Sequence, residues 1–410
     1  MYTFRRKLPI ISPLPKLLPL IFPLIVLNLS DAILSYTVPL YANALLPNDL
    51  LIGIVISLSS LVGLIFDYAS KRLFGSKNFA FFVKATFILS VAYSSLLGLS
   101  FVNKYFFLLA MAAWGMYYET LAFSNFKYLK NAVDRRDYTS SWSFINMLRA
   151  LIYAVGPLVA TFLMSQQFQL PTYFCGVFVL AAFFLYLALF PKNAKIKAST
   201  ASIVESRTEL KVWLILFKKI YPLWVLNLTL AIVDSGFWTV GILMSEKLGK
   251  ISPLAILFIP AYMLPAVLFS PLSQVFSNKF GKKRTAIITS LIGSVALCIV
   301  GLVTRVEFIL TAVFAYSVFT SLTFPAIYSA VEDYIKRLGD FDTDLIGLEQ
   351  SSTSIAYVIG PILAGFVAYQ FTEQSVFFVF GLLLAWVSVF VLLVTPHKIR
   401  MPQTELLNIS

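Results

Sequence analysis

The sequence FPLIVLNLS at residues 22–30 recurs as YPLWVLNLT at residues 221–229, 199 positions further along the chain. Continuing the alignment to residue 35 gives eight identities in fourteen positions, all inside strongly apolar sequence. A repeat close to half the length of a 410-residue chain is typical of membrane proteins that build two bundles around a central site. The repeat therefore predicts two related halves.

The composition also indicates a membrane protein. Hydrophobic residues make up 59% of the chain, aromatic residues 16% and charged residues only 12%, unlike water-soluble domains. Crossing hydrocarbon about 30 Å thick takes roughly 20 mostly apolar helical residues, because the backbone must satisfy its own hydrogen bonds there. We predict an all-α integral membrane fold of twelve transmembrane helices in two pseudo-symmetric six-helix bundles.

The predicted helices and segments follow from the apolar runs and the polar stretches between them. The helices cover residues 17–45, 50–70, 79–101, 105–127, 142–165, 172–191, 219–244, 252–277, 285–304, 307–331, 346–370 and 375–395. The segments are a cytoplasmic N-terminus at 1–16, a first bundle at 17–191, a cytoplasmic linker at 192–218, a second bundle at 219–395 and a cytoplasmic tail at 396–410.

Lysine and arginine are distributed unequally between alternate loops. The loops on the side of the two termini, with the termini themselves, hold 26 of the 32 basic residues. Because positive charge collects on cytoplasmic loops, both termini are expected in the cytoplasm and the protein in the cell membrane. The net charge of +13 then follows from topology and from contact with anionic membrane lipids, so nucleic-acid binding is not expected.

A charged motif follows the second predicted helix of each half, as GLIFDYASKR at residues 63–72 and NKFGKK at residues 278–283. A carboxylate at one helix end can cap the N-terminus of a neighbouring helix, while lysine and arginine meet lipid phosphate. Alternatively, the bases only enforce topology and the aspartate is solvated. The motif residues are Gly63, Asp67, Lys71, Arg72, Asn278, Gly281, Lys282 and Lys283.

With this motif, nearly the whole chain resembles the major facilitator superfamily, whose loop signature is Gly-x-Leu-x-Asp-Arg-x-Gly-Arg-Lys. Tyr68 and Ser70 depart from that signature. The resemblance implies a two-bundle transporter and a role for Asp67, Lys71 and Arg72 in stabilising one end state of the transport cycle.

A second repeated element is the dipeptide Gly156-Pro157, which recurs as Gly360-Pro361, 204 positions later. Glycine permits close helix approach and proline bends a helix, which suits the seam between two bundles. The first copy resembles the fifth-helix motif of the family's antiporters, although Ile152 stands where that motif has an earlier glycine. A purely structural kink is the alternative.

Two carboxylates lie midway along corresponding helices of the two halves, Asp31 and Asp234. Ionisable residues near the bilayer centre cost at least about 2.5 kcal/mol on insertion scales, so they normally face a cavity or a partner. Asn28 precedes Asp31 by three residues and Asn227 precedes Asp234 by seven, so each pair shares a helix face. We predict that these residues line one cavity and bind substrate or couple protons.

Glu119 and Arg149 fall in the cytoplasmic halves of consecutive predicted helices. They are expected either to form a buried structural ion pair or to act in coupling, with Glu119 exchanging protons while Arg149 alternates between partners. Glu349 is expected in the first turn of the predicted helix 346–370 as an acid stabilised by the helix dipole.

Several functions are excluded by what the sequence lacks. It contains no Gly-x-x-x-x-Gly-Lys-Ser/Thr phosphate loop, and its one histidine, His397, lies in the predicted tail, so ATP-driven pumping, histidine relays and His/Cys metal sites are not expected. We expect no enzyme activity, no cofactor and no metal.

The predicted function is secondary active transport of a small organic solute by alternating access, by a monomer. Proton-coupled efflux is the leading version, because Asp31, Asp234 and Glu119 supply carboxyl groups within the membrane. The alternatives are a facilitator or proton symporter that imports a metabolite, or a receptor or scaffold that does not transport.

Overall fold

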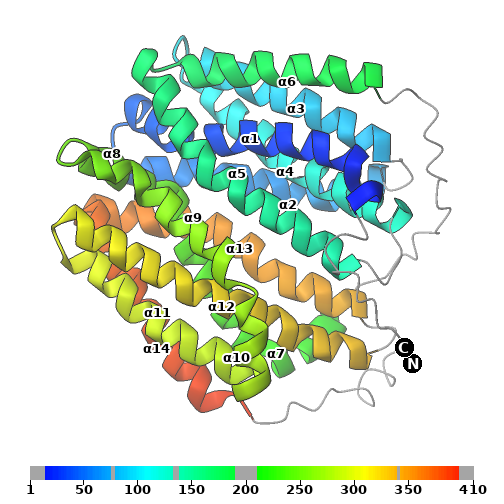
Figure 1. The fold of residues 1–410 in the computed structure, drawn as a ribbon, viewed down its shortest axis with the longest axis vertical. Coiled ribbons are helices and arrows are strands. Elements are labelled where there is room, and N and C mark those ends of the chain that lie inside the picture. The colour runs from blue at the N-terminus through cyan, green and yellow to red at the C-terminus, as the bar shows by residue number, and fades with distance from the viewer. Residues whose placement is uncertain (1–13, 75–78, 133–137, 190–209, 339–341, 397–410) are drawn as a thin grey trace, which may run out of the picture. The chain divides into compact units, whose positions relative to one another are not determined.

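The computed structural model describes residues 14–74, 79–132, 138–189, 210–338 and 342–396, which are helical almost throughout and include no strand (Figure 1). In this part of the chain, eleven helical spans are long and apolar enough to cross a membrane, and one bent pair makes a twelfth if it is counted as a single span. The predicted all-α membrane fold is confirmed.

The first compact unit contains α1, the part of α2 after residue 57, and α3 to α6. Within it, α3 packs against α4 and α6, while α1 packs against α5 and α6 (Figure 1). The helices are α1 (Leu14–Leu45), α2 (Asp49–Phe74), α3 (Phe79–Leu99), α4 (Tyr105–Ala132), α5 (Tyr138–Gln166) and α6 (Leu170–Leu189).

The second unit contains the start of α2 and everything from α7 onward. Here α11 packs between α12 and α14, and α13 packs along α7 (Figure 1). The elements are α7 (Leu210–Gly236), the π-helical turn η2 (Phe237–Gly241), α8 (Ile242–Gly249), the 3₁₀ turn η3 (Pro253–Leu257), α9 (Phe258–Phe269), α10 (Leu272–Phe280), α11 (Lys282–Leu302), α12 (Val306–Leu338), α13 (Asp342–Gln370) and α14 (Glu373–Val394).

The predicted continuous helix over 252–277 is wrong, because this span is broken. It begins as the 3₁₀ turn η3, continues as α9, and bends by 62° before α10. Pro271 lies at the break as the residue before α10, and a proline has no N–H to continue the helical hydrogen bonds.

The seventh predicted helix starts too late. α7 begins at Leu210, so its first two turns occupy positions assigned to the linker; the rest of that linker lies outside the described residues. The early turns are not polar on all sides, because Val212 and Leu216 are buried there. Beyond Gly236 the helix continues through η2 into α8, which makes one 39-residue apolar span, Lys211–Gly249.

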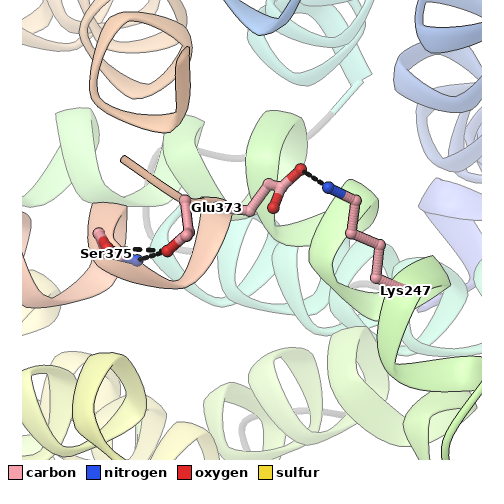
Figure 2. Close-up of polar contacts among 4 residues, drawn as sticks. Lys247, Glu373 and Ser375 are labelled. Carbon is pink, nitrogen blue, oxygen red and sulfur yellow. Dashed lines mark hydrogen bonds and ion pairs between the residues drawn. The ribbon is translucent and has the colours of Figure 1, made fainter. Parts of the chain in front are cut away.

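The start of α14 is fixed by two polar contacts, both visible in Figure 2. Thr372 caps the helix by accepting a hydrogen bond from the backbone N–H of Ser375 at 3.1 Å. The carboxylate of Glu373 in the first turn forms an ion pair with Lys247 of α8. Glu373 is largely buried, whereas the Lys247 side chain is 61% exposed, so the lysine compensates the buried carboxylate and ties α8 to α14 within the second unit.

The repeated glycines allow one close helix contact in each unit. A Cβ atom at Gly156 of α5 would lie 2.5 Å from the Cβ of Ala32 in α1, and one at Gly360 of α13 would lie 1.9 Å from the Oγ of Ser235 in α7. Both distances are shorter than side chains tolerate, so α5 can approach α1, and α13 can approach α7, only with glycine at these positions. Their predicted place at a seam between bundles stays a prediction.

Replacing Gly156 by alanine is therefore expected to destabilise the first unit by about 1–3 kcal/mol, the usual cost of overpacking. Thermal unfolding of the purified protein in lipid nanodiscs measures this. Gly249→Ala is the control, because nothing lies within 4 Å of a Cβ atom there. Equal melting temperatures for the two variants would show that the α1–α5 contact does not need a glycine.

Candidate functional site

Asp31 lies in the middle of α1 and is 2% exposed. Three side chains donate hydrogen bonds to its carboxylate: the indole N–H of Trp114 to Oδ1 at 2.8 Å, the hydroxyl of Tyr118 to Oδ2 at 2.9 Å, and the hydroxyl of Tyr153 to Oδ2. Two of these donors come from α4 and one from α5. The hydroxyls of Tyr118 and Tyr153 also lie 3.4 Å apart, so the two tyrosines and the carboxylate form one network.

The α4 donors are themselves held in place. Trp114 stacks on Tyr93 of α3 with ring centroids 5.5 Å apart and an interplanar angle of 5°. Tyr117, between the two donors on the same helix, donates to the backbone oxygen of Leu27 in α1 at 3.0 Å. This aromatic face of α4 fixes the donors against α1, so the buried carboxylate of Asp31 is held among its three hydrogen-bond donors.

Arg149 is next to this cluster but at its edge. Its guanidinium lies 5.2 Å from the ring centroid of Tyr153, one helical turn further along α5, and interacts electrostatically with the carboxylate of Asp31. Arg149 is exposed, in contrast to Asp31. The structure therefore places the arginine within the electrostatic field of the α1 carboxylate.

Glu119 lies beside Gly63, where α4 meets α2. Its Oε1 is 3.6 Å from the position of a Cβ atom at Gly63, and a Cβ there would also be 3.3 Å from the carbonyl oxygen of Gly115 in α4. The motif glycine thus serves close packing of these two helices. The predicted ion pair of Glu119 with Arg149 stays a prediction.

Asp234, near the end of α7, is the centre of a second cluster. Tyr262 of α9 donates to its Oδ1 and Tyr357 of α13 donates to its Oδ2. Tyr262 is stacked on Phe237 with ring centroids 4.0 Å apart, and Phe237 opens the π-helical turn η2. Such π-turns are rare and are frequent at functional sites; this one places an aromatic ring directly behind a donor to Asp234.

The two clusters share the same arrangement of aspartate, tyrosine and Gly-Pro. Each carboxylate accepts a hydrogen bond from a tyrosine three residues before the repeated Gly-Pro, Tyr153 in one unit and Tyr357 in the other. Each glycine packs against the residue that follows the aspartate, Ala32 or Ser235. The close contact made by the glycine therefore brings the tyrosine, one turn earlier, to the carboxylate.

The tyrosines were not identified from the sequence, although a signal for them exists. Asp31 and Asp234 are 203 positions apart, and Tyr153 and Tyr357 are 204 apart. The repeat at residues 22–30 has an offset of 199, so the aspartates do not align there. Extending the Gly-Pro repeat backward to Tyr-x-x-Gly-Pro would have found both tyrosines.

The two predicted asparagines have different surroundings. The Asn28 amide donates to the backbone oxygen of Leu24 in its own helix at 2.8 Å. The Asn227 amide instead donates to α13, to the Oε1 of Glu349 at 3.1 Å and to the Oγ of Ser352 at 2.8 Å. A common cavity-lining role for Asn28 and Asn227 stays a prediction.

The expected position of Glu349 in a first helical turn is wrong. α13 begins at Asp342, so Glu349 lies about two turns inside the helix, too far in to interact with the free N–H groups of its terminus. The helix start predicted from the sequence is too late, because residues 342–344 are the polar sequence Asp-Thr-Asp.

The charged loop motif is described only in part. Asp67 is partly buried in α2; Lys71 and Arg72 lie in the last turn of that helix, and their side chains lie outside the described residues. In the second copy, Lys282 donates to Asp333 at 2.6 Å and to the backbone oxygen of Ser329 at 3.1 Å, both in α12. This lysine fastens the start of α11 to α12.

Three other residues of the second copy are also described by the structure. Gly281 joins α10 to α11 with a φ of +86°, a left-handed conformation that favours glycine. Lys283 donates to the backbone oxygen of Pro396 after α14, and Asn278 is exposed. The stabilisation of one transport state by this motif stays a prediction.

Replacing Tyr153 or Tyr357 by phenylalanine removes one donor to a carboxylate and is expected to lower the stability of the folded protein by about 0.5–3 kcal/mol. Thermal unfolding in nanodiscs measures the loss. The matched control is Tyr173→Phe, whose hydroxyl bonds to Gln169 on the exposed surface of α6. If all three variants melt at the same temperature, the tyrosine donors do not support the carboxylates.

Comparison with known proteins agrees with this architecture. A family model described as Major Facilitator Superfamily matches residues 223–406. The quinolone resistance protein NorA of Staphylococcus aureus (strain MRSA252) is 28% identical over 260 residues, which cover 62% of this chain and 64% of that protein. The match thus spans less than two thirds of the relative.

Solved transporter structures share the fold at low sequence identity. The nucleoside transporter NupG aligns with a TM-score of 0.71 at 14% identity, covering 93% of this chain and 99% of NupG. The peptide transporter POT in complex with sulfate aligns with a TM-score of 0.71 at 14% identity, covering 94% of this chain and 95% of POT. At such identities the likeness concerns the fold alone.

Proposed function

We propose that this chain, whose residues 223–406 match the Major Facilitator Superfamily model and which is similar to NorA, is a proton-coupled secondary transporter that exports a small organic solute by alternating access. The observation that carries this proposal is the pair of intramembrane carboxylates, Asp31 and Asp234, each bonded by tyrosine hydroxyls. The proton is the coupling ion in this proposal, and Asp31 and Asp234 exchange it.

A tyrosine hydroxyl suits a carboxyl group that changes its protonation state. It donates to an ionised carboxylate and accepts from a protonated one, whereas lysine and arginine only donate. Among the described residues, the hydrogen-bond donors to Asp31 are all uncharged: one indole and two hydroxyls. The cluster can therefore satisfy Asp31 both with and without its proton, which limits the cost of burying either form.

The likeness to NorA supports export as the direction, since NorA is a quinolone resistance protein. The aromatic rings beside both carboxylates support a lipophilic substrate with a positive charge, because aromatic faces and carboxylates attract organic cations. Such a cation would compete with protons for the same carboxyl groups. Competition of this kind couples the two movements in opposite directions.

The alternative is an importer or facilitator whose carboxylates only bind substrate. Arg149 favours this alternative, because its positive charge interacts with the carboxylate of Asp31 and gives that carboxylate a role that needs no proton exchange. Flux that continues after the pH gradient is collapsed supports the alternative.

The test uses ethidium as the probe in proteoliposomes with an imposed pH gradient. Wild-type protein is expected to move ethidium against its gradient. Asp31→Asn and Asp234→Asn are each expected to lower this flux at least about fivefold, the lower end of typical coupling free energies. The control is Glu246→Gln, an exposed acid of α8, which should leave the flux unchanged. Flux equal to wild type in both aspartate variants at every pH would refute the proposal.

A further inference from the structure

A third polar cluster lies between α7 and α13 and is separate from the two aspartate clusters. Its centre is the amide of Asn227, which is 1% exposed. The amide nitrogen donates to the Oε1 of Glu349 at 3.1 Å, to the Oγ of Ser352 at 2.8 Å and to the Oγ1 of Thr353 at 3.5 Å. The four side chains form a compact group in which Glu349 is the only carboxyl.

Two polar groups of this cluster lack a partner that would compensate them. The amide oxygen of Asn227 is buried and has no hydrogen-bond donor, and leaving a buried acceptor unsatisfied is unfavourable. Glu349 is only partly exposed and, within the described part of the chain, forms no ion pair with a lysine or arginine. The cluster therefore holds both a carboxylate without a cation and an acceptor without a donor.

Uptake of one proton neutralises the carboxylate and supplies a donor that the amide oxygen can accept. A protonated carboxyl group gains an O–H donor, and a rotated Asn227 amide presents its oxygen to that donor. An asparagine amide can pair with either form of the acid, through its N–H groups when the acid is ionised and through its oxygen when the acid is neutral. We propose that Glu349 is a further proton-binding site of this transporter and that Asn227 turns over when the proton arrives.

Other titratable groups around Glu349 are few. Of the elements packed on α13, α12 brings Tyr328, which interacts electrostatically with Glu349 and hydrogen-bonds to the side chains of Asn227 and Thr353. One turn beyond Tyr328, α12 also carries Glu332, which is exposed. Helix α7 brings Asp234, two turns beyond Asn227, and the start of α2 brings Asp49, which packs against Gly365 near the other end of α13. The turn η2 contains no titratable residue, and α14 contains only Glu373, which lies at the opposite end of α13. The basic residues Lys218 and Lys219 precede Asn227 in α7 by more than two turns.

The test is infrared difference spectroscopy between acid and alkaline pH, on the full chain in lipid nanodiscs without substrate. Wild-type protein is expected to show a carboxylic acid C=O band that disappears in Glu349→Gln. The band should remain in Glu307→Gln, an exposed acid of α12. In Asn227→Leu the band should move to the position of an acid without a strong hydrogen-bond acceptor.

Two further measurements keep the test decisive. If Glu349→Gln does not fold, Glu349→Asp serves in its place, and the band should shift rather than disappear. A spectrum of either folded variant that equals the wild-type spectrum would overturn the proposal. So would loss of the band on adding sodium chloride at fixed acid pH, because the cluster would then be a sodium site.

The use of this proton in transport rests on the proposed function, but its binding does not. If the aspartate variants above transport normally while the Glu349 band is present, coupling through Asp31 and Asp234 fails and Glu349 still binds a proton. If those variants lose flux while the band is absent, the proposed function holds and the Glu349 site is excluded.

Discussion

Within a hydrocarbon layer, a carboxyl group needs hydrogen-bond partners supplied by the protein itself, and this constraint organises both units. In the first unit, α4 and α5 supply an indole and two hydroxyls to Asp31. In the second, α9 and α13 supply two hydroxyls to Asp234. The surrounding helix contacts, aromatic stacking and close glycine approaches all hold these donors at the two carboxylates.

The duplication of the chain explains the likeness of the two clusters and also their differences. Both units keep a tyrosine and a Gly-Pro on equivalent helices, α5 and α13, which pack against α1 and α7. The aspartate is one turn further along α7 than a simple copy of α1 would place it. Among the described residues, the third cluster has no matching contact in the first unit, because Asn28 bonds to its own helix where Asn227 bonds to Glu349. The two units therefore differ in the partner of this asparagine although they share the tyrosine and the Gly-Pro.

Much of the fold follows from local sequence, because a membrane helix is defined by the length and polarity of its apolar run. The breaks and irregular turns within these helices were harder to predict. The break at Pro271 lies inside an apolar segment, and the π-turn after Asp234 carries Phe237, which stacks on Tyr262 of another helix. The start of α7 was missed because its first apolar run, residues 212–217, is only six residues long and is bounded by Lys211, Lys218 and Lys219, so it was assigned to the polar linker.

The site was predicted in outline only. The rarity of charge in the spans identifies Asp31 and Asp234, but their partners come from helices more than eighty residues away for Asp31 and more than twenty for Asp234. Such pairings depend on helix packing, which the periodicity of a single helix does not determine. The internal repeat provides a sequence signal for these distant partners, because Tyr153 and Tyr357 occupy the same position before the repeated Gly-Pro.

The central claim is that Asp31 and Asp234 exchange protons for substrate. Its most direct test is the release of protons when ethidium is added to the purified protein in weakly buffered solution, followed with a pH indicator. The account predicts that wild-type protein releases protons and that the variant carrying both Asp31→Asn and Asp234→Asn releases none. Equal proton release from the two proteins, or no release from wild-type protein that binds ethidium, would contradict it.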